Sequence, residues 1–240
     1  MRTPTGAGLA LCLALMLSAC QRDDEAFGKR VHAYLMAHPE VIRDVAAKLQ
    51  ENDRLAAVKA SSAAIGKHRD QLERDPRDVV LNPNGKVTVV EFFDYRCGYC
   101  KLAAPQVAEL IREHPDVRFV FKQYPIFGEV SDTAAKVSLT GPAKAKALAL
   151  YTGLMAEKAL TEETLNAQLQ AAGMDPAATR QAAQDPAIER HILDTRALAT
   201  ALHIEGTPAF IVGDTMIAGA DLGALRAAIA VAKAGELKSS

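Results

Sequence analysis

The feature that most constrains this chain is a short segment in which an apolar run leads directly into two closely spaced cysteines. Residues 86–102 read KVTVVEFFDYRCGYCKL. The β-branched and aromatic residues of 87–93 predict a buried strand, and the apolar residues after the second cysteine repeat with helical spacing. The segment therefore predicts a strand, a short turn, and then Cys97 and Cys100 at the start of a helix.

A thiol at the start of a helix is expected to be acidic. The first helical turn has unpaired amide groups and the positive end of the helix dipole, which favour a thiolate at Cys97. Arg96 and Lys101 add positive charge nearby. An accessible Cys97 thiolate can attack a disulfide, and Cys100, one turn further along, can resolve the mixed disulfide by exchange. We therefore predict that the two cysteines work as a redox pair.

Two other uses of such a cysteine pair are less well supported by the sequence. Structural zinc needs four ligands, and the sequence has no second Cys-x-x-Cys and no Cys-x-x-His. A structural disulfide across two residues would close a very small loop and contribute little stability. Four histidines are scattered through the sequence: His68, His114, His191 and His203. Each is expected to lie on the surface or to be hydrogen-bonded in the core, so no metal ligand and no cofactor is predicted.

The first twenty residues are typical of a bacterial export signal. Arg2 gives a positive start, and the apolar run 9–17 is too short to remain as a membrane-spanning helix. The segment ends Leu-Ser-Ala-Cys, which resembles a lipobox and predicts that Cys20 is lipidated as the mature N-terminus. An ordinary signal peptide cleaved near Ala19 would instead leave Cys20 as a free thiol, which is a liability in an exported protein. We therefore expect a periplasmic protein. The lipobox is the favoured alternative, and it would anchor the protein to a membrane through the lipid on Cys20.

Residues 21–78 are predicted to form an N-terminal helical region. Its residues favour helices, and Pro39 suits the first turn of a second, long helix. The apolar side chains of 27–75 lie in helical stripes that a lone helix cannot bury. They either pack back on the chain or pair with other copies, and self-association is favoured. The near-zero net charge of −1, with no basic block, argues against a nucleic-acid partner.

The remaining residues predict an α/β fold. A polar segment, 74–86, is expected to be a linker into the first strand. A second strand at 117–124 would lie parallel to the first across the intervening helix, as in a right-handed crossover. Residues 131–200 have only helical patterns, and a strand and hairpin then follow in residues 206–217. A helix at 221–233 closes the chain.

Three motifs in this order, FFDYRCGYC, QYPIFGEVSDTAA and IEGTPAFIVG, resemble those of the DsbA-like thiol-disulfide oxidoreductases of the bacterial envelope. The resemblance implies a thioredoxin fold over 79–235, with a helical domain, 131–200, inserted between sheet strands. It also implies that Thr207 and Pro208 are joined by a cis peptide bond beside the redox pair. An ordinary trans proline at the start of a strand is the alternative.

The substrate would contact the residues around this pair. The resemblance implies that backbone groups near Thr207 and Pro208 face the substrate segment. Gly98 and Tyr99 lie between the cysteines, and the Tyr99 ring is expected to cover bound substrate. Glu91 is expected to be a solvated carboxylate near the end of the strand, with a buried proton shuttle as the alternative.

Within this family the N-terminal helices, the CGYC sequence and Thr207 resemble the ScsC-like branch. That resemblance implies a disulfide isomerase or reductase acting on misoxidised envelope proteins and kept reduced by a membrane thiol reductase of the DsbD type. A monomeric DsbA-type oxidase with an oxidase partner is one alternative, since direction depends on the reduction potential. A Cu(I)-binding copper-tolerance protein is another, because two close thiolates suit Cu(I).

Overall fold

The structure is a computed structural model that describes residues 25–239, and the chain divides into two units after Ala57. The predicted export signal and the predicted lipidation site Cys20 lie outside the described residues. None of the helices in 25–239 combines the length and apolar character needed to cross a bilayer.

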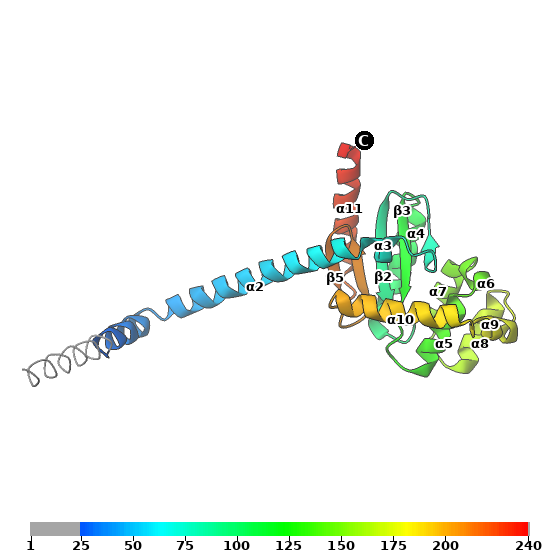
Figure 1. The fold of residues 1–240 in the computed structure, drawn as a ribbon, viewed down its shortest axis with the longest axis horizontal. Helices are drawn as coiled ribbons and strands as arrows, with labels where there is room; N and C mark the ends of the chain where they lie inside the picture. Colours follow the sequence, from blue (N-terminus) through cyan, green and yellow to red (C-terminus); the bar gives the residue numbers. More distant parts are fainter. Residues whose placement is uncertain (1–24, 240) are drawn as a thin grey trace, which may run out of the picture. The chain divides into compact units, whose positions relative to one another are not determined.

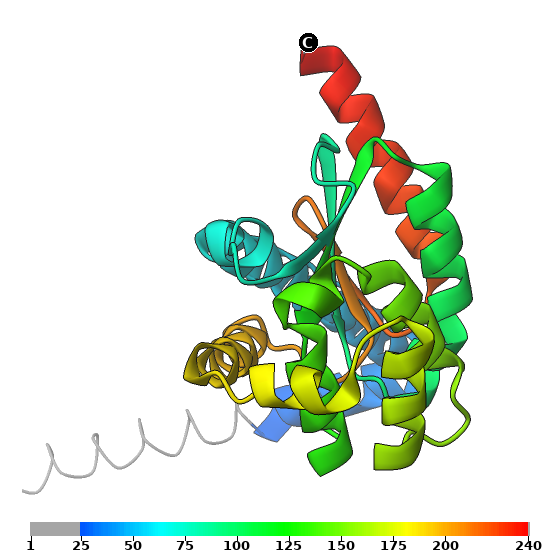
Figure 2. The same ribbon diagram turned by 90° about the vertical axis from the view of Figure 1, so that its right-hand side faces the viewer.

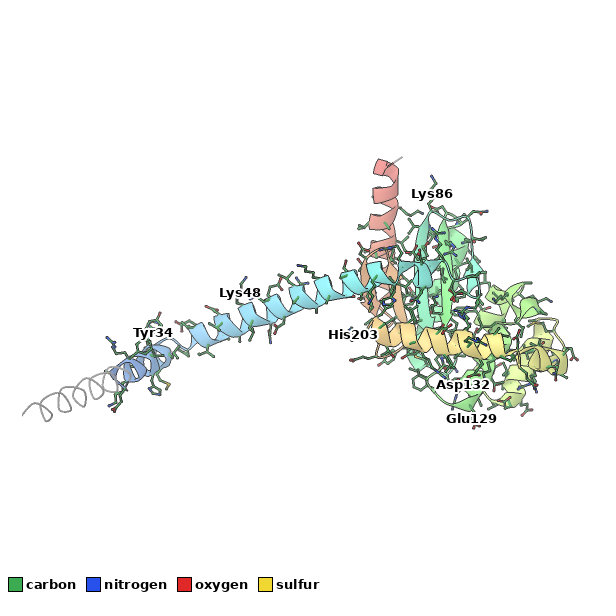
Figure 3. The ribbon with its side chains drawn as sticks, viewed as in Figure 1. Tyr34, Lys48, Lys86, Glu129, Asp132 and His203 are labelled. Carbon is green, nitrogen blue, oxygen red and sulfur yellow. The ribbon has the colours of Figure 1, made fainter. Side chains whose placement is uncertain are left out.

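The first unit contains a helix over residues 25–37 and most of α2, which spans Glu40–Lys67. Pro39 separates the two helices, and Glu40 places a negative charge in the first turn of α2, where it favours the helix dipole. Most of the large apolar side chains of this unit are exposed rather than packed. Figure 3 shows Tyr34 projecting from the first helix, and its exposed fraction is 57%.

The second unit is built on a five-stranded sheet with the order β1-β3-β2-β4-β5 (Figure 1). Strands β2 and β3 are parallel, as predicted, and every other neighbouring pair is antiparallel. All seven residues of each of these two central strands are buried, which explains their unbroken β-branched and aromatic sequences. The strands are β1 Val79–Leu81, β2 Val87–Phe93, β3 Val117–Gln123, β4 Ala209–Val212 and β5 Thr215–Ala218.

Helices cover both faces of this sheet (Figure 2). One face packs against α4, α7 and α11, and the opposite face packs against the end of α2, α3 and α10. The predicted insert consists of six helices between β3 and β4. The helices of this unit are α3 Arg69–Glu73, α4 Gly98–Glu113, α5 Glu129–Ser138, α6 Gly141–Lys144, α7 Ala147–Ala156, α8 Glu162–Ala171, α9 Pro176–Ala182, α10 Pro186–Ala201 and α11 Leu222–Ser239.

The starts of three insert helices follow local sequence signals. Thr161, Asp175 and Asp185 are the N-cap residues of α8, α9 and α10, and each side chain accepts a hydrogen bond from a backbone amide of the first turn. Proline follows both aspartates, where its fixed backbone angle suits the first helical position. The predicted α/β architecture with a helical insert and an N-terminal helical extension is confirmed.

The junction between the N-terminal helices and the sheet differs from the expectation. Residues 74–86 contain strand β1 rather than only a linker, and Ile65 and Leu72, which the sequence placed in the N-terminal region, lie in the core. The Lys122 ammonium on β3 donates to Gln71 O and to the Asp78 carboxylate, each at 2.5 Å, and this ties α3 and the segment before β1 to the sheet. Such contacts join residues far apart in sequence, so local patterns do not show them.

Candidate active site

Cys97 lies where the sequence predicts, between the end of β2 and the first turn of α4. It is the N-cap residue of α4, and its Sγ accepts a hydrogen bond from the Cys100 amide at 3.3 Å. Both Cys97 and Cys100 are free thiols in the structure. The two sulfurs are therefore held on one helical turn, with the amide groups of that turn directed at Cys97.

Cys97 is less accessible than expected, with 4% of its surface exposed against 0% for Cys100. The reason is the chain segment before β4, because the carbonyl oxygen of Thr207 lies 3.1 Å from the Cys97 sulfur and accepts a hydrogen bond from it. Cys97 is nevertheless the outer sulfur of the pair. A substrate disulfide would therefore meet Cys97 first.

The surroundings of the two thiols shift their pKa values in opposite directions. The hydrogen bond from the Cys100 thiol is the largest influence on Cys97 and, together with the amides of Cys100 and Tyr99, lowers the pKa of Cys97 to about 6 despite partial burial. Burial raises the pKa of the Cys100 thiol far above its ordinary value, and the hydrogen bond to Cys97 and the charge of Glu91 raise it further. Cys97 is thus the more acidic of the two thiols, and burial disfavours ionisation of Cys100.

Thr207 and Pro208 lie beside the redox pair because β4 pairs with β2. In this register Ala209 lies opposite Phe92, which brings the two residues before β4 next to the turn after β2. The Thr207–Pro208 peptide bond is cis. Gly98 and Tyr99, between the two cysteines, are both exposed. The structure therefore brings together all the residues that the sequence suggested for substrate contact.

Glu91 is not the solvated carboxylate that the sequence led us to expect. It lies on β2 with 1% of its surface exposed, because this strand is covered on both faces. The Tyr151 hydroxyl on α7 donates to both carboxylate oxygens, at 3.2 and 3.3 Å. Burial raises the pKa of Glu91 to about 8, against a lowering by Tyr151 and a further rise from the charge of Cys97. A buried acid that changes charge near neutral pH therefore lies beneath the redox pair.

The buried carboxylate of Asp94 joins the turn before Cys97 to the loop after β3. One oxygen accepts hydrogen bonds from the amide of Arg96 and the hydroxyl of Ser131, and the other accepts from the amides of Ile126 and Phe127, all between 2.6 and 3.0 Å. The sequence showed Asp94 only as a break after a strand. Its role as a clamp depends on residues more than thirty positions away.

Four exposed apolar side chains lie on the two segments beside the redox pair, and we call them the apolar rim. It consists of four side chains with exposed fractions between 41% and 69%, namely Tyr99, Leu102, Ile126 and Phe127. The Arg96 guanidinium donates to the carbonyl oxygen of Phe127 at 2.6 Å, which holds the two sides of the rim together. Exposed apolar side chains gathered at one place are typical of surfaces that bind other proteins.

Within residues 25–239, no three or more His, Cys, Asp or Glu side chains are grouped so that they could hold a metal ion. Of the four histidines considered from the sequence, only His191 is buried. It lies on α10, near the carboxylates of Asp75 and Asp78. The site therefore offers two thiols, a buried acid and an apolar surface, which together suit thiol-disulfide exchange.

Comparison with known proteins agrees with this chemistry. Residues 88–229 match the family described as DSBA-like thioredoxin domain, and residues 23–56 match the copper resistance protein ScsC N-terminal domain. Among curated proteins, 79 residues are 37% identical to Na(+)/H(+) antiporter NhaA 3 of Salinispora tropica, but the chain spans only 12% of the length of that protein.

Three solved structures are similar over most of their own length. BcfH of Salmonella enterica Typhimurium is 32% identical, with 93% of this chain and 99% of that chain covered and a TM-score of 0.72. A thioredoxin-like oxidoreductase of Silicibacter pomeroyi is 37% identical, with coverages of 69% and 97% and a TM-score of 0.65. A periplasmic thioredoxin-like protein of Salmonella enterica serovar Typhimurium is 31% identical, with coverages of 69% and 95% and a TM-score of 0.63.

The family match covers more than half of the chain and includes the redox pair, the insert and all the strands of the sheet except β1 and the first residue of β2. The match at the N-terminus confirms the predicted likeness to the ScsC branch. The chain therefore belongs to the DSBA-like thioredoxin domain family, as a thiol-disulfide oxidoreductase with a ScsC-type N-terminal domain.

Proposed function

We propose that this protein is an exported disulfide isomerase or reductase that acts on misoxidised envelope proteins. The Cys97 thiolate attacks a substrate disulfide and forms a mixed disulfide, and one substrate sulfur leaves as a thiolate. In isomerisation that thiolate attacks another disulfide of the substrate, and the substrate thiolate freed there attacks the mixed disulfide and releases Cys97 as a thiolate. In reduction the substrate sulfur stays reduced, while Cys100 attacks Cys97, forms the Cys97–Cys100 disulfide and releases the second substrate sulfur as a thiolate.

The substrate segment is proposed to lie along Thr207 and Pro208, with Gly98 and Tyr99 on its other side. The cover over Cys97 consists of backbone, the carbonyl oxygen of Thr207, so an extended peptide has hydrogen-bonding groups to meet there. The apolar rim would bind exposed apolar side chains of an unfolded client. A folded protein buries such side chains, so this surface favours unfolded substrates.

The observation that favours isomerase over monomeric oxidase is the uncovered apolar surface of the first unit. Five of its large apolar side chains are 57–60% exposed. Phe27 and Tyr34 are seven positions, or two helical turns, apart in the first helix, and Ile42, Val45 and Leu49 follow at spacings of three and four in α2. We propose that other copies of this chain cover them, because helices with one apolar stripe are stabilised by pairing. Several redox pairs in one assembly could then act on the same misfolded client.

The acidity of Cys97 is compatible with a disulfide isomerase or reductase. A thiol pKa of about 6 lies between values near 7, found in thioredoxin, and near 3.5, found in the strong oxidant DsbA. A lower pKa stabilises the reduced pair and makes its disulfide more oxidising. An intermediate value suits a protein that both attacks wrong disulfides and releases its substrate.

The proposed place of action is the bacterial periplasm, where misoxidised disulfides arise. The export signal in the sequence supports it, and so does the solved relative described as a periplasmic protein. Lipidation of Cys20 stays a prediction of the sequence. A membrane thiol reductase of the DsbD type would keep the pair reduced, or an oxidase partner would keep it oxidised.

The test is reactivation of scrambled ribonuclease by the reduced full-length protein. We expect recovery of ribonuclease activity, and we expect none with Cys97→Ser, which lacks the attacking sulfur. Failure with scrambled ribonuclease, together with rapid oxidation of reduced, unfolded ribonuclease by the disulfide form, would show that the protein is an oxidase instead.

Cu(I) binding is the second candidate, favoured by two free thiols on one helical turn. Competition with a Cu(I) chelator tests it in the full-length protein. Affinity no higher than that of a small dithiol would exclude a copper-binding function, and loss of tight binding in Cys100→Ser would support it.

A further inference from the structure

The helical insert reaches the buried acid beneath the redox pair through one side chain. Tyr151 lies on α7, sixty positions after Glu91, and is 1% exposed. Its hydroxyl is nearly equidistant from the two Glu91 oxygens, at 3.2 and 3.3 Å. Glu91 has no other side-chain hydrogen-bond partner among the described residues, so Tyr151 alone orients this carboxylate.

The Tyr151 ring is fixed on two sides by aromatic residues of the central strands. It stacks on Phe121 with ring centroids 4.7 Å apart, and it meets the edge of Phe93 at 5.3 Å and 85°. A ring held in this way keeps its hydroxyl in one position. Burial and the charge of Glu91 keep the pKa of Tyr151 well above its ordinary value, so the hydroxyl remains a donor.

Disulfide exchange requires a place for the proton of Cys100. Cys100 is completely buried, and its thiol must lose its proton before it can attack the mixed disulfide on Cys97. Cys97, Cys100 and Tyr151 belong to one buried cluster of the core, and the hydrogen bonds of the Tyr151 hydroxyl join Glu91 to it. The charge of Glu91 acts on both Cys100 and Tyr151, and the charge of Cys97 acts on Glu91. Glu91 is the carboxylate of this cluster whose charge acts on the Cys100 thiol.

We propose that Tyr151 is a positioning residue of the exchange reaction, which holds the Glu91 carboxylate where it accepts the proton of the Cys100 thiol. The proposal rests on the proposed function, because it concerns the step that releases the substrate. The Cys100 proton passes to Glu91, the Cys100 thiolate forms a bond to Cys97, and the bond between Cys97 and the substrate sulfur breaks. The redox pair is oxidised, and the substrate leaves as a reduced thiolate.

The test separates the attack of Cys97 from the resolution by Cys100. Reduced full-length protein is mixed with glutathione disulfide between pH 5 and pH 10, reactions are stopped by alkylation, and the protein carrying glutathione is followed by mass spectrometry. Because the Tyr151 hydroxyl stabilises ionised Glu91, Tyr151→Phe should raise the pKa of Glu91 above about 8. The midpoint of the resolution rate should then move up by about one pH unit, and resolution at pH 7 should slow about tenfold. The attack of Cys97 should keep its pH dependence.

Tyr95→Phe is the matched control. Tyr95 is also buried and packs edge-on against Phe93 at 5.0 Å, but its hydroxyl bonds to Ser138 and Gln123 and not to Glu91. Its resolution profile should match that of the wild type. An equal shift in Tyr95→Phe, or a Tyr151→Phe profile that overlays the wild type, would overturn the proposal.

Glu91→Gln distinguishes this proposal from the proposed function. The glutamine cannot accept the proton, so resolution should be slow and should lack the pH midpoint seen in the wild type. The double variant Glu91→Gln with Tyr151→Phe should resolve the mixed disulfide no more slowly than Glu91→Gln alone. Additive losses would show that Tyr151 acts by packing and would overturn the proposal. A carboxyl titration of Glu91 by carbon-13 NMR, unchanged in Tyr151→Phe, would do the same. Failure of the wild type to reactivate scrambled ribonuclease would count against isomerase activity alone.

Discussion

At the scale of single residues, Cys97 and Cys100 lie on one helical turn and differ in almost every property that matters for reactivity. Cys97 receives hydrogen bonds from the helix start and from Cys100, which stabilise its thiolate. Cys100 has no exposed surface and is surrounded by groups that disfavour a second negative charge. This asymmetry supports the proposal that Cys97 attacks the substrate disulfide and Cys100 resolves the mixed disulfide, although free cysteines are chemically identical.

The contribution of Cys100 to the acidity of Cys97 can be measured by alkylation. Cys100→Ala removes the largest influence that lowers the pKa of Cys97, so the pKa should rise from about 6 by roughly one to two units. The rate of reaction with iodoacetamide between pH 4 and pH 10 gives the midpoint. A midpoint still near 6 in Cys100→Ala would show that the helix start alone makes Cys97 acidic.

At the scale of secondary-structure elements, the site is made by the junctions of β2 with α4 and of β3 with α5. Gly128, at the start of α5, has a positive φ of 92°, which lets the chain turn sharply after the apolar loop. Asp94 holds this loop beside Cys97 through the amides of Ile126 and Phe127. Two segments that are far apart in sequence thus both contribute side chains to the apolar rim.

Substitution of Phe127 tests the rim as a client-binding surface. Phe127→Ser removes a ring that is 47% exposed and should raise KM for an unfolded protein substrate about fivefold, with kcat little changed. Steady-state reduction of insulin, followed by precipitation of its chains, gives both constants. Leu193→Ser on α10, where the side chain is 51% exposed, is the control and should leave KM unchanged. Equal effects of both substitutions would show that the apolar rim is not part of the substrate-binding surface.

At the scale of the whole molecule, the two units differ in how they are stabilised. The second unit has buried cores on both faces of its sheet. The first unit consists of helices whose apolar side chains are exposed in the described chain. Most of the stability of a protein helix comes from packing of its apolar face, so the first unit depends on contacts beyond itself.

Substitution of Leu49 tests assembly through this unit. Leu49→Lys places a charge in the apolar stripe of α2 and should convert an oligomer into monomers at micromolar concentration, which sedimentation velocity measures. Gln50→Lys adds the same charge at the neighbouring exposed position and should leave the mass unchanged. A wild-type protein that sediments as a monomer would rule out assembly, and with it the main support for isomerase over oxidase.

Much of the second unit could be predicted from local patterns. The apolar run of β2, the start of α4 at Gly98 and the capped starts of α8, α9 and α10 all follow from short-range preferences for strands and helix ends. Strand β1 was missed because three residues are too few to show a period, and their place at the sheet edge depends on pairing with β3. The exposed apolar stripes of the first unit also follow directly from residue spacing.

The sequence by itself determined the strand-turn-helix that carries Cys97 and Cys100, because residues adjacent in the chain define it. Only the tertiary structure decided the burial of Glu91, its bond to Tyr151, the Asp94 clamp and the cover of Thr207 over Cys97. Each of these joins residues between thirty and more than one hundred positions apart. The physical reason is that a pKa, a hydrogen bond and a buried surface depend on what lies nearby in space, and residue spacing reports only neighbours within a helix or a strand.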